Sequence, residues 1–237
     1  LEGQANGMGV FRDGGLTDYT VIPNKFAYKI AQDTPPELMA LAEPLECCGY
    51  SIEKLNIHVG DSVCILGAGP IGQMYAALAR ANGATKVIVS EPVAYRRNKA
   101  LEIGATRVVD PNEEDIVKVC MEETNGVGVD HCIEAVGAML MTCIECVRAR
   151  GKVLQCGHDE ITRAEIAVGV VLKKEVEIHG AFLGKYYMAK VARIIESGVL
   201  PLDKIVTHKF PLSKYGEALD LARSGQCIKV VVIPEGE

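Results

Sequence analysis

The spacing of apolar positions along this chain switches repeatedly between the period of a strand and the period of a helix. From residue 63 to residue 182, short apolar runs typical of buried strands alternate with segments of helical spacing. The runs predict strands at residues 63–66, 86–90, 107–110, 129–135, 151–156 and 175–182, and the segments between them predict helices at residues 73–81, 96–103, 113–124 and 139–149. Strands separated by helices predict an α/β fold, a doubly wound parallel sheet with helices on both faces.

Both ends of the chain follow other patterns. Near the start, residues 16–23 alternate between apolar and polar positions as a short strand does, and residues 24–30 could form another strand. A helix that begins near Pro35 or Pro36 is expected to break at Pro44 and to resume through residue 52, because proline lacks the N–H of a helical hydrogen bond. Toward the end, the pattern predicts helices at residues 188–197 and 212–224 and strands at residues 205–210 and 227–233.

The composition is that of a globular protein and argues against several function classes. Of the 237 residues, 49% are hydrophobic and 24% are charged, and the net charge of −6 comes with no basic cluster, which argues against a nucleic-acid partner. No apolar run reaches the length of a membrane span, and the first residues lack the basic and apolar stretches of a signal peptide. We therefore expect a cytoplasmic protein, and the absence of an initial Met suggests that the chain begins inside a longer one.

The nine cysteines show no spacing typical of a disulfide framework. Most lie in apolar runs or on a predicted helix, as the reduced thiols of a cytoplasmic protein do. Cys143 and Cys146 form a CxxC pair that could bind a metal or undergo redox chemistry, although a helical pair without a second CxxC more often serves packing. Since the five histidines have no metal-ligand spacing either, the sequence predicts no four-coordinate zinc site made of these residues.

The most informative motif is Gly67-x-Gly69-x-x-Gly72, which follows the first buried strand and opens a helix. This order is that of a dinucleotide-binding βαβ unit, in which Gly67 permits the tight turn, Gly69 lets backbone approach the pyrophosphate, and Gly72 lets the helix pack close to the strand. The helix N-terminus supplies free N–H groups for the phosphates, so Pro70 and Ile71 belong to the expected binding turn. The alternative is an ordinary glycine-rich turn of an α/β sheet.

Glu91 closes the next predicted strand, where its carboxylate would accept hydrogen bonds from both ribose hydroxyls of a dinucleotide. The same charge would repel the 2′-phosphate of NADP, so the sequence favours NAD as the cofactor. Arg96 and Arg97 follow, and one of them could instead hold a phosphate. Val136 and Gly157 fall at the ends of two later strands, and ligands bind in the crevice outside the carboxyl ends of parallel strands.

A series of short segments, in matching order and spacing, resembles the zinc-dependent medium-chain dehydrogenase/reductase family of alcohol and polyol dehydrogenases, in its sorbitol-dehydrogenase-like branch. They lie at residues 14–19, 43–45, 60–63, 67–72, 101–105, 128–130, 134–137, 151–153, 207–212 and 228–231. The resemblance implies an enzyme that transfers a hydride between a secondary alcohol or polyol and NAD, with zinc binding the substrate oxygen. It also implies a Rossmann domain for NAD at residues 44–181 and a partial, β-rich GroES-like catalytic domain at residues 1–43 and 182–237.

The resemblance further implies roles for single residues. Glu43 stands at a Glu-Pro position that lies at the catalytic zinc in the polyol-dehydrogenase branch, and the alternative is an ordinary helix-end carboxylate. Lys229 matches the basic residue that reaches the pyrophosphate, and Arg96 matches the one near the adenosine ribose, although either could be a solvated surface residue. Val136 and Gly157 match positions whose backbone lines the nicotinamide side.

One departure from the family pattern leaves the function open. The family's other catalytic zinc ligands, a Cys and a Gly-His-Glu segment, precede the part that residues 14–19 match, and this sequence does not contain them. Two alternatives therefore remain: a zinc-free quinone or enone reductase of the same superfamily, and a non-catalytic nucleotide-binding module. For the main interpretation we expect an alcohol or ketone substrate and a homo-oligomer, a dimer or tetramer, with no nucleic-acid or membrane partner.

Overall fold

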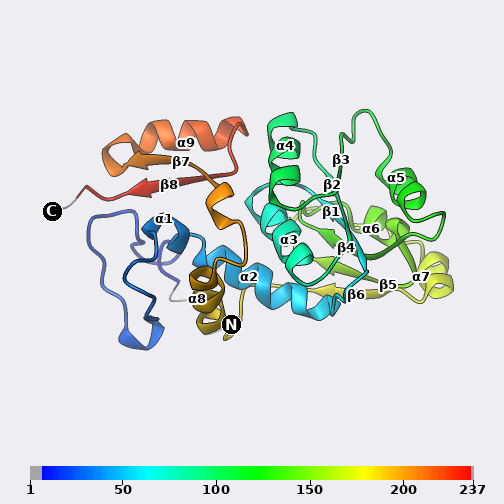
Figure 1. The fold of residues 1–237 in the computed structure, drawn as a ribbon, viewed down its shortest axis with the longest axis horizontal. Helices are drawn as coiled ribbons and strands as arrows, with labels where there is room; N and C mark the ends of the chain where they lie inside the picture. The colour runs from blue at the N-terminus through cyan, green and yellow to red at the C-terminus, as the bar shows by residue number, and fades with distance from the viewer. Residues whose placement is uncertain (1–6, 236–237) are drawn as a thin grey trace.

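The computed structural model describes residues 7–235, which form an α/β fold around a six-stranded parallel sheet (Figure 1). The strands are β1 (Ser62–Leu66), β2 (Lys86–Ser90), β3 (Arg107–Val109), β4 (Val129–Glu134), β5 (Val147–Gln155) and β6 (Glu177–Gly180). They lie in the order β3-β2-β1-β4-β5-β6, and every neighbouring pair is parallel. This is the order of a doubly wound dinucleotide-binding sheet, which reverses between β1 and β4. The predicted fold is confirmed.

Both faces of the sheet are apolar and covered by helices. On β1, Val63 and Ile65 belong to the core on one face, while Cys64 and Leu66 belong to the core on the other, as the two-residue period of a strand requires. Helices α3 (Pro70–Ala81) and α4 (Ala94–Ile103) cover the first face, and α5 (Ile116–Glu123), α6 (Leu140–Cys146) and α7 (Val168–Lys174) cover the second. This double covering explains why the strands read as continuous apolar runs in the sequence.

Two details of the sheet region differ from the prediction. Residues 147–149 were expected to end a helix, but α6 ends at Cys146 and Val147 pairs with Val129 of β4. The pairing of β4 with β5 then shifts in register, and within the shifted segment Arg150 adopts a φ of 59°. Helix α7 was not predicted, because its apolar residues follow one another from Val168 to Leu172 without the spacing of a helix face, although Val170 and Val171 pack against the second core.

Helix α2 (Ala42–Ile52) connects the sheet to the outer part of the molecule. It follows the short helix α1 (Pro36–Met39) and packs against both α3 and α8 (Met188–Ser197). The prediction of a break at Pro44 is wrong, since the helix is interrupted at residues 40–41 and Pro44 lies in the first turn of α2. A missing N–H is harmless there, because the first four N–H groups of a helix have no intrahelical acceptor.

The C-terminal part adds a small second sheet. Strands β7 (Val206–Pro211) and β8 (Lys229–Ile233) are parallel and are connected through α9 (Tyr215–Ser224). Gly198 and Gly225 adopt left-handed backbone angles, with φ values of 63° and 74°, and end α8 and α9. The strands and helices predicted here are confirmed to within a few residues. Short 3-10 helices occur at Asn24–Phe26, Glu53–Leu55, Leu202–Lys204 and Leu212–Lys214.

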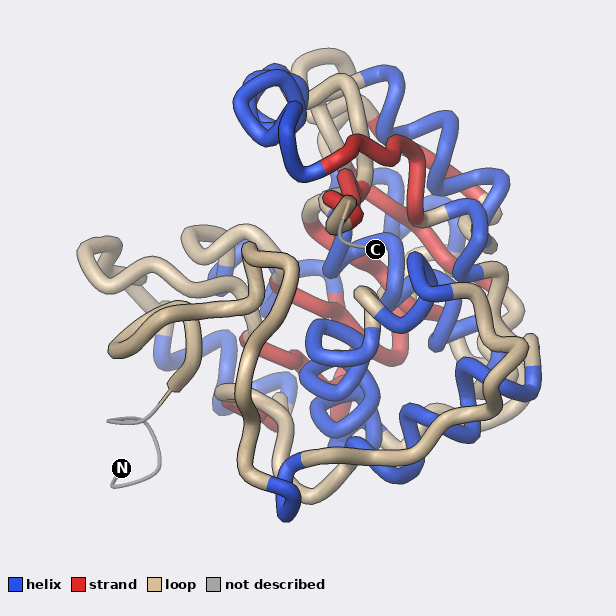
Figure 2. Tube along the Cα trace, turned by 90° about the vertical axis from the view of Figure 1, so that its left-hand side faces the viewer, coloured by secondary structure: helices blue, strands red, loops and turns tan. Residues whose placement is uncertain are grey.

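Residues 7–35 form loops rather than strands, so the strands predicted at residues 16–23 and 24–30 are wrong (Figure 2). Apart from a 3-10 helix and an isolated bridge between Met8 and Arg12, this segment has no regular structure. A strand requires a neighbour for its backbone hydrogen bonds, and nothing in residues 7–235 pairs with this segment. Most of its apolar side chains therefore remain exposed, with Val21 at 91%, although Ile30 packs against the first core.

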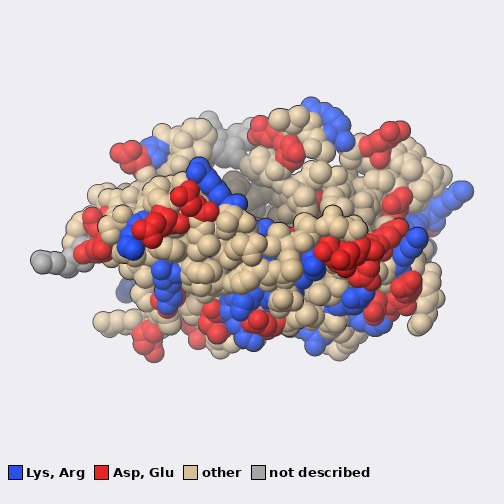
Figure 3. Space-filling model, turned by 90° about the horizontal axis from the view of Figure 1, so that it is seen from above, with Lys and Arg blue, Asp and Glu red and all other residues tan. Residues whose placement is uncertain are grey.

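The division into domains at residues 44 and 182 stays a prediction. One buried core contains Leu41, Ile65 and Val191, which come from different sides of these boundaries. Within residues 7–235, no helix is long and apolar enough to cross a membrane. Acidic and basic side chains are interspersed over the face seen in Figure 3, and this face has no extended basic patch.

Candidate functional site

The glycine turn between β1 and α3 lies where the strand order of the sheet reverses. Gly67 adopts a φ of +96° and donates its N–H to the carbonyl oxygen of Ser90 at 2.8 Å. A Cβ on Gly72 would lie 2.0 Å from the carbonyl oxygen of Gly67, so only glycine lets α3 start this close to the strand. Gly69, by contrast, has open space where its Cβ would be, and Pro70 after it begins α3. Free N–H groups of a helix start next to open space form an arrangement that binds phosphate.

Glu91 follows β2, and its buried carboxylate faces this turn. The residue is only 4% exposed. Its Oε2 accepts the N–H of Ala68 at 2.8 Å, and its Oε1 accepts the N–H of Val93 at 3.0 Å. A carboxylate has about four acceptor positions, so two of them remain after these bonds for hydroxyl groups of a ligand.

A second buried carboxylate, Glu134, stands at the end of β4 and was not predicted as a site residue. It is fully buried and accepts the N–H groups of Val136 at 3.2 Å, Gly137 at 2.8 Å and Met139 at 3.3 Å. The side-chain amide of Gln155 on β5 donates to the same carboxylate at 2.7 Å. Glu134 therefore fixes the loop after β4 to the end of β5. The sequence signal was a carboxylate closing an apolar strand, as Glu91 does.

The loops after β4 and β5 lie against each other and against the glycine turn. A Cβ on Gly157 would lie 2.2 Å from the Gly137 nitrogen, which only glycine avoids. Val136 is 52% exposed, and its Cγ2 lies next to Gly67. The loop after β5 also lines a groove of about 1300 Å³ together with residues 180–185 and α2. In this groove the ring of His158 lies 5.8 Å from that of Phe182, so the structure places a groove beside the strand ends.

A hydrogen-bond chain connects the glycine turn to the C-terminal part. The buried amide of Gln73 donates to the carbonyl oxygens of Ala68 at 3.1 Å and of Arg96 at 3.0 Å. The Arg96 Nε donates to the carbonyl oxygen of Cys227 at 3.4 Å, two residues before Lys229. Lys229 is half-buried at the start of β8, and its ammonium forms no hydrogen bond or ion pair with residues 7–235. The structure thus brings Arg96 near the segment that carries Lys229, whereas Arg97 is paired with Asp110 at 2.8 Å.

Glu43 lies exposed in the first turn of α2, and its Oε1 is 3.6 Å from the Cys47 Sγ. Burial, followed by the nearby charge of Glu43, raises the pKa of Cys47 to about 11, so this thiol is protonated at neutral pH. Leu45 and Cys48 of α2 and Cys156 after β5 pack in the same core, which places α2 beside the end of this strand. Within residues 7–235 no third donor joins Glu43 and Cys47, so these residues do not complete a zinc site there.

The structure gathers most of the predicted residues along the carboxyl edge of the sheet. Gly67, Glu91, Val136 and Gly157 follow four adjacent strands at this edge, as the register of Leu66 with both Ser90 and Glu134 requires. Ile71 lies in the first turn of α3 beside them. Sequence reasoning did not identify Glu134, Gln73 and Gln155, which position these loops.

Comparison with known proteins identifies similar chains. The family model described as zinc-binding dehydrogenase matches residues 70–197. An L-threonine 3-dehydrogenase of Thermococcus kodakarensis is 38% identical over 96% of this chain and 66% of its own length. A sorbitol dehydrogenase of Bombyx mori is 33% identical over 92% of this chain and 64% of its own length.

Solved structures agree with these matches. A protein of Sinorhizobium meliloti described as a zinc-binding dehydrogenase, solved with bound NADP, superposes with a TM-score of 0.88 and 32% identity, over 96% of this chain and 68% of that one. This chain therefore spans roughly two thirds of the length of the proteins it matches, 66% for the Thermococcus protein.

Proposed function

This chain belongs to the zinc-binding dehydrogenase family. We propose that it binds NAD at the carboxyl edge of its six-stranded sheet and that it is part of an oxidoreductase. The proposed reaction transfers a hydride between a secondary alcohol or polyol and NAD. L-threonine and sorbitol, for which two of the relatives are named, both carry a secondary hydroxyl group. The single observation that carries the proposal is the glycine turn with the Glu91 carboxylate facing it.

Along the carboxyl edge of the sheet, separate groups of residues would bind separate parts of the dinucleotide. Gly67, Gly69 and Gly72 shape the turn in which the free N–H groups of α3 would bind the pyrophosphate. Pro70 and Ile71 hold this helix start, while Arg96 and Lys229 would add positive charge beside the phosphates. When bound, NAD supplies the hydride acceptor, and the protein orients it.

The nicotinamide end of the cofactor would lie against the loops after β4 and β5, which Glu134 holds together. Val136 lies over the turn at Gly67, and Gly157 lets the two loops pack closely against each other. Both residues would contact the cofactor through backbone or van der Waals contact. The adjoining groove beside His158 and Phe182 is the space available to an alcohol.

Glu91 is the basis for choosing NAD over NADP. Its carboxylate would accept hydrogen bonds from the ribose hydroxyls and would repel a 2′-phosphate. The Sinorhizobium protein was solved with NADP, so the choice rests on this residue and not on the relatives.

Glu43 is the one residue of this chain that we propose as a ligand or neighbour of a catalytic zinc ion. We propose that Glu43 supplies one ligand to a zinc ion or lies beside it, which fits its place at the start of α2, the helix beside the end of β5. Glu43 and Cys47 give at most two of the three protein donors that a catalytic zinc ion needs. No step of the reaction is therefore assigned to the metal. A dimeric or tetrameric assembly and a cytoplasmic location belong to the same proposal.

Titration calorimetry with NAD and NADP tests the cofactor assignment. We expect NAD to bind at least about tenfold more tightly than NADP, a difference of roughly 1.4 kcal/mol. Glu91→Ala should narrow this difference, while Asp130→Asn, which removes a carboxylate at the opposite edge of the sheet, should not. Equal or tighter binding of NADP by the unmodified protein would refute the role of Glu91.

Turnover of the longest form that the gene encodes tests the reaction class. We expect NAD-dependent oxidation of secondary alcohols or polyols, with Glu43→Gln reducing zinc content or turnover but not NAD affinity. Reduction of quinones or enones without zinc would favour the reductase alternative, and NAD binding without any turnover would favour a nucleotide-binding module.

A further inference from the structure

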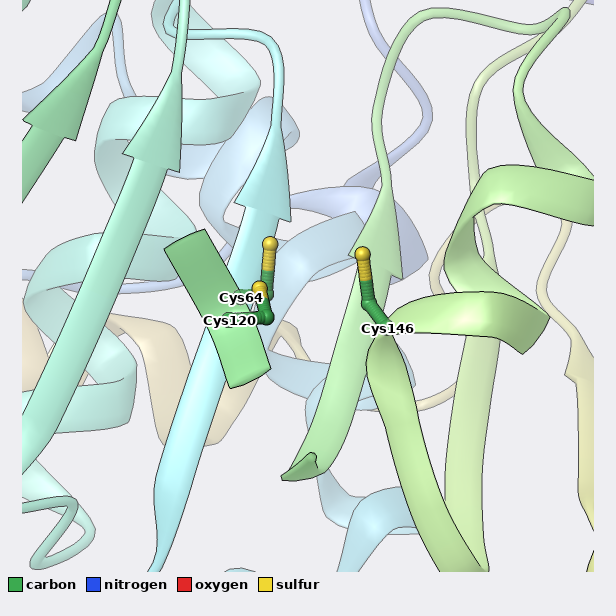
Figure 4. Close-up of side chains that lie close together, drawn as sticks. All are labelled: Cys64, Cys120 and Cys146. Carbon is green, nitrogen blue, oxygen red and sulfur yellow. The ribbon is translucent and has the colours of Figure 1, made fainter. Parts of the chain in front are cut away.

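Three cysteines from separate elements meet in the core on the second face of the sheet (Figure 4). They are Cys64 on β1, Cys120 on α5 and Cys146 at the end of α6, and we refer to them as the thiol cluster. Their Sγ atoms all lie within 4.8 Å of one another, and each residue is fully buried. This convergence could not be predicted from the sequence, because the three residues lie far apart along the chain and only Cys146 belongs to a CxxC pair.

A fourth thiol lies beside the cluster. Cys132 is the register partner of Cys64 on the neighbouring strand β4, so both side chains point to the same face of the sheet. The Cys132 thiol belongs to the same buried core, but it is not one of the three thiols whose sulfurs all lie within 4.8 Å of one another. Three soft donors therefore converge from one strand and two helices, and a fourth thiol lies on the neighbouring strand.

A positive charge is held next to the cluster. The Lys174 ammonium donates to the carbonyl oxygens of Ile144 at 3.1 Å, Glu145 at 2.8 Å and Val147 at 2.8 Å, at the C-terminal end of α6. These bonds fix the ammonium beside the end of the helix that carries Cys146. A cation at this point would offset part of the negative charge of thiolates bound to a metal ion.

We propose that the thiol cluster binds one thiophilic metal ion, with Zn²⁺ as the best match, and that Cys132 is the available fourth donor. A Zn–S bond of about 2.3 Å places the sulfurs of a tetrahedral ion about 3.8 Å apart, so sulfurs at 4.8 Å or less need to approach by at most about 1 Å. Three thiolates around Zn²⁺ leave a net charge of −1, and a fourth thiolate from Cys132 would make it −2, so the Lys174 ammonium would offset one unit of this charge. Soft thiolate sets select zinc and copper(I) over magnesium or calcium.

This site is separate from the proposed catalytic zinc and does not depend on the proposed function. Glu43 is on α2, which covers the first face of the sheet, whereas the cluster lies under the second face. The metal would join β1, α5 and α6 directly beneath the strand that leads into the glycine turn. Since the cluster is buried, loading would occur during folding, as it does for other structural metal sites.

Cobalt substitution tests the site in the full chain, which is reduced, unfolded and stripped of metal, and is then refolded with Co²⁺ under anaerobic conditions. We expect one equivalent of Co²⁺ to produce a sulfur-to-cobalt charge-transfer band that one equivalent of Zn²⁺ abolishes. The double substitution C120A/C146A should weaken Co²⁺ binding by at least about tenfold. Cys227→Ala, which removes an equally buried thiol elsewhere, and Glu43→Gln should leave the band unchanged. Absence of the band in the unmodified chain, or its persistence in C120A/C146A, would overturn the proposal and leave the thiols as packing groups.

A second measurement needs no variant and covers the case in which C120A/C146A does not fold. Cysteine alkylation in mild denaturant, mapped by mass spectrometry, is compared with and without added Zn²⁺. We expect Zn²⁺ to slow alkylation of Cys64, Cys120 and Cys146 at least about tenfold more than that of Cys48 and Cys227. Uniform slowing of all the thiols, or none at all, would place the metal elsewhere and contradict the proposal.

Discussion

Buried or partly buried carboxylates stand at both edges of the six-stranded sheet, but they bind different partners. At the carboxyl edge, Glu91 and Glu134 accept backbone N–H groups of the loops that follow the strands. At the amino edge, Asp130 binds the Ser62 hydroxyl at 2.7 Å and the Arg148 Nε at 2.6 Å, and Asp61 binds the His131 ring at 2.9 Å.

The difference shows how the same chemical group serves two purposes. At the amino edge, Asp130 forms an ion pair with Arg148 and Asp61 is hydrogen-bonded to His131, and these side-chain contacts connect neighbouring strands and so contribute to stability. The carboxyl-edge carboxylates form no ion pair with any residue between 7 and 235, and they hold loop backbone instead. A ligand can therefore add hydrogen bonds at Glu91, and the geometry of the loops around it depends on Glu134.

The strongest test of this comparison is Glu134→Ala. The change leaves three backbone N–H groups and the Gln155 amide without their acceptor in a buried place. Each orphaned donor costs about 1–3 kcal/mol, so we expect the free energy of unfolding to fall by at least about 3 kcal/mol. NAD affinity should fall as well, because the loop after β4 loses its anchor. Denaturant unfolding and calorimetry measure both effects, and an unchanged free energy of unfolding would show that Glu134 does not hold the loop.

A second test separates packing from binding within the glycine turn. Gly72→Ala places a Cβ 2.0 Å from the Gly67 carbonyl oxygen, so we expect a loss of about 1–3 kcal/mol in stability together with weaker NAD binding. Gly69→Ala is the matched control, because Gly69 has an ordinary φ of −67° and open space around it. It should leave the melting temperature nearly unchanged and weaken NAD binding alone. If both variants bind NAD as the unmodified chain does, the turn is not the pyrophosphate site.

At the amino edge, Asp130→Asn should lower stability without affecting the cofactor. Burial alone would raise the pKa of Asp130, but its bonds to Arg148 and Ser62 hold the pKa below its usual range. We expect a loss of about 1.5 kcal/mol in the free energy of unfolding, typical of a hydrogen bond to a charged group. NAD affinity, measured by calorimetry, should stay the same. A large decrease in NAD affinity would contradict the separation of the two edges.

The smallest expected effect concerns pH and His131. Burial lowers the pKa of His131 despite its hydrogen bond to Asp61. The unfolded chain therefore takes up a proton near the ordinary pKa of about 6.5, while the folded chain does so only at lower pH. Stability should fall as the pH decreases through this window, from about pH 7.5 to about pH 5.5, and His131→Asn should flatten that decrease. Chemical unfolding at several pH values measures the slope, and an identical slope in His131→Asn would assign it to other groups.

The sequence alone specified those parts of the fold that depend on local pattern. Strand β2 and helix α8 begin and end where the periodicity placed them, because a buried strand and an amphipathic helix each show their period within ten residues or so. The glycine turn was equally local, since its φ angle at Gly67 and the close approach at Gly72 both require glycine within a short motif. Glu91 was predictable because it closes a strand at a fixed distance from that motif.

Only the tertiary structure decided where separate segments meet. The alternation at residues 16–23 resembles a strand, yet it finds no partner within residues 7–235, and backbone hydrogen bonding in a sheet requires one. Glu134 became recognisable as a positioning residue only when β5 lay beside β4 and the loop N–H groups turned toward its carboxylate. The thiol cluster is the clearest case, since Cys64, Cys120 and Cys146 read separately as small apolar residues and gain a shared chemistry only because the doubly wound sheet packs β1 against α5 and α6. Local spacing encodes which element a residue forms, whereas the distance between side chains on different elements is fixed by their packing.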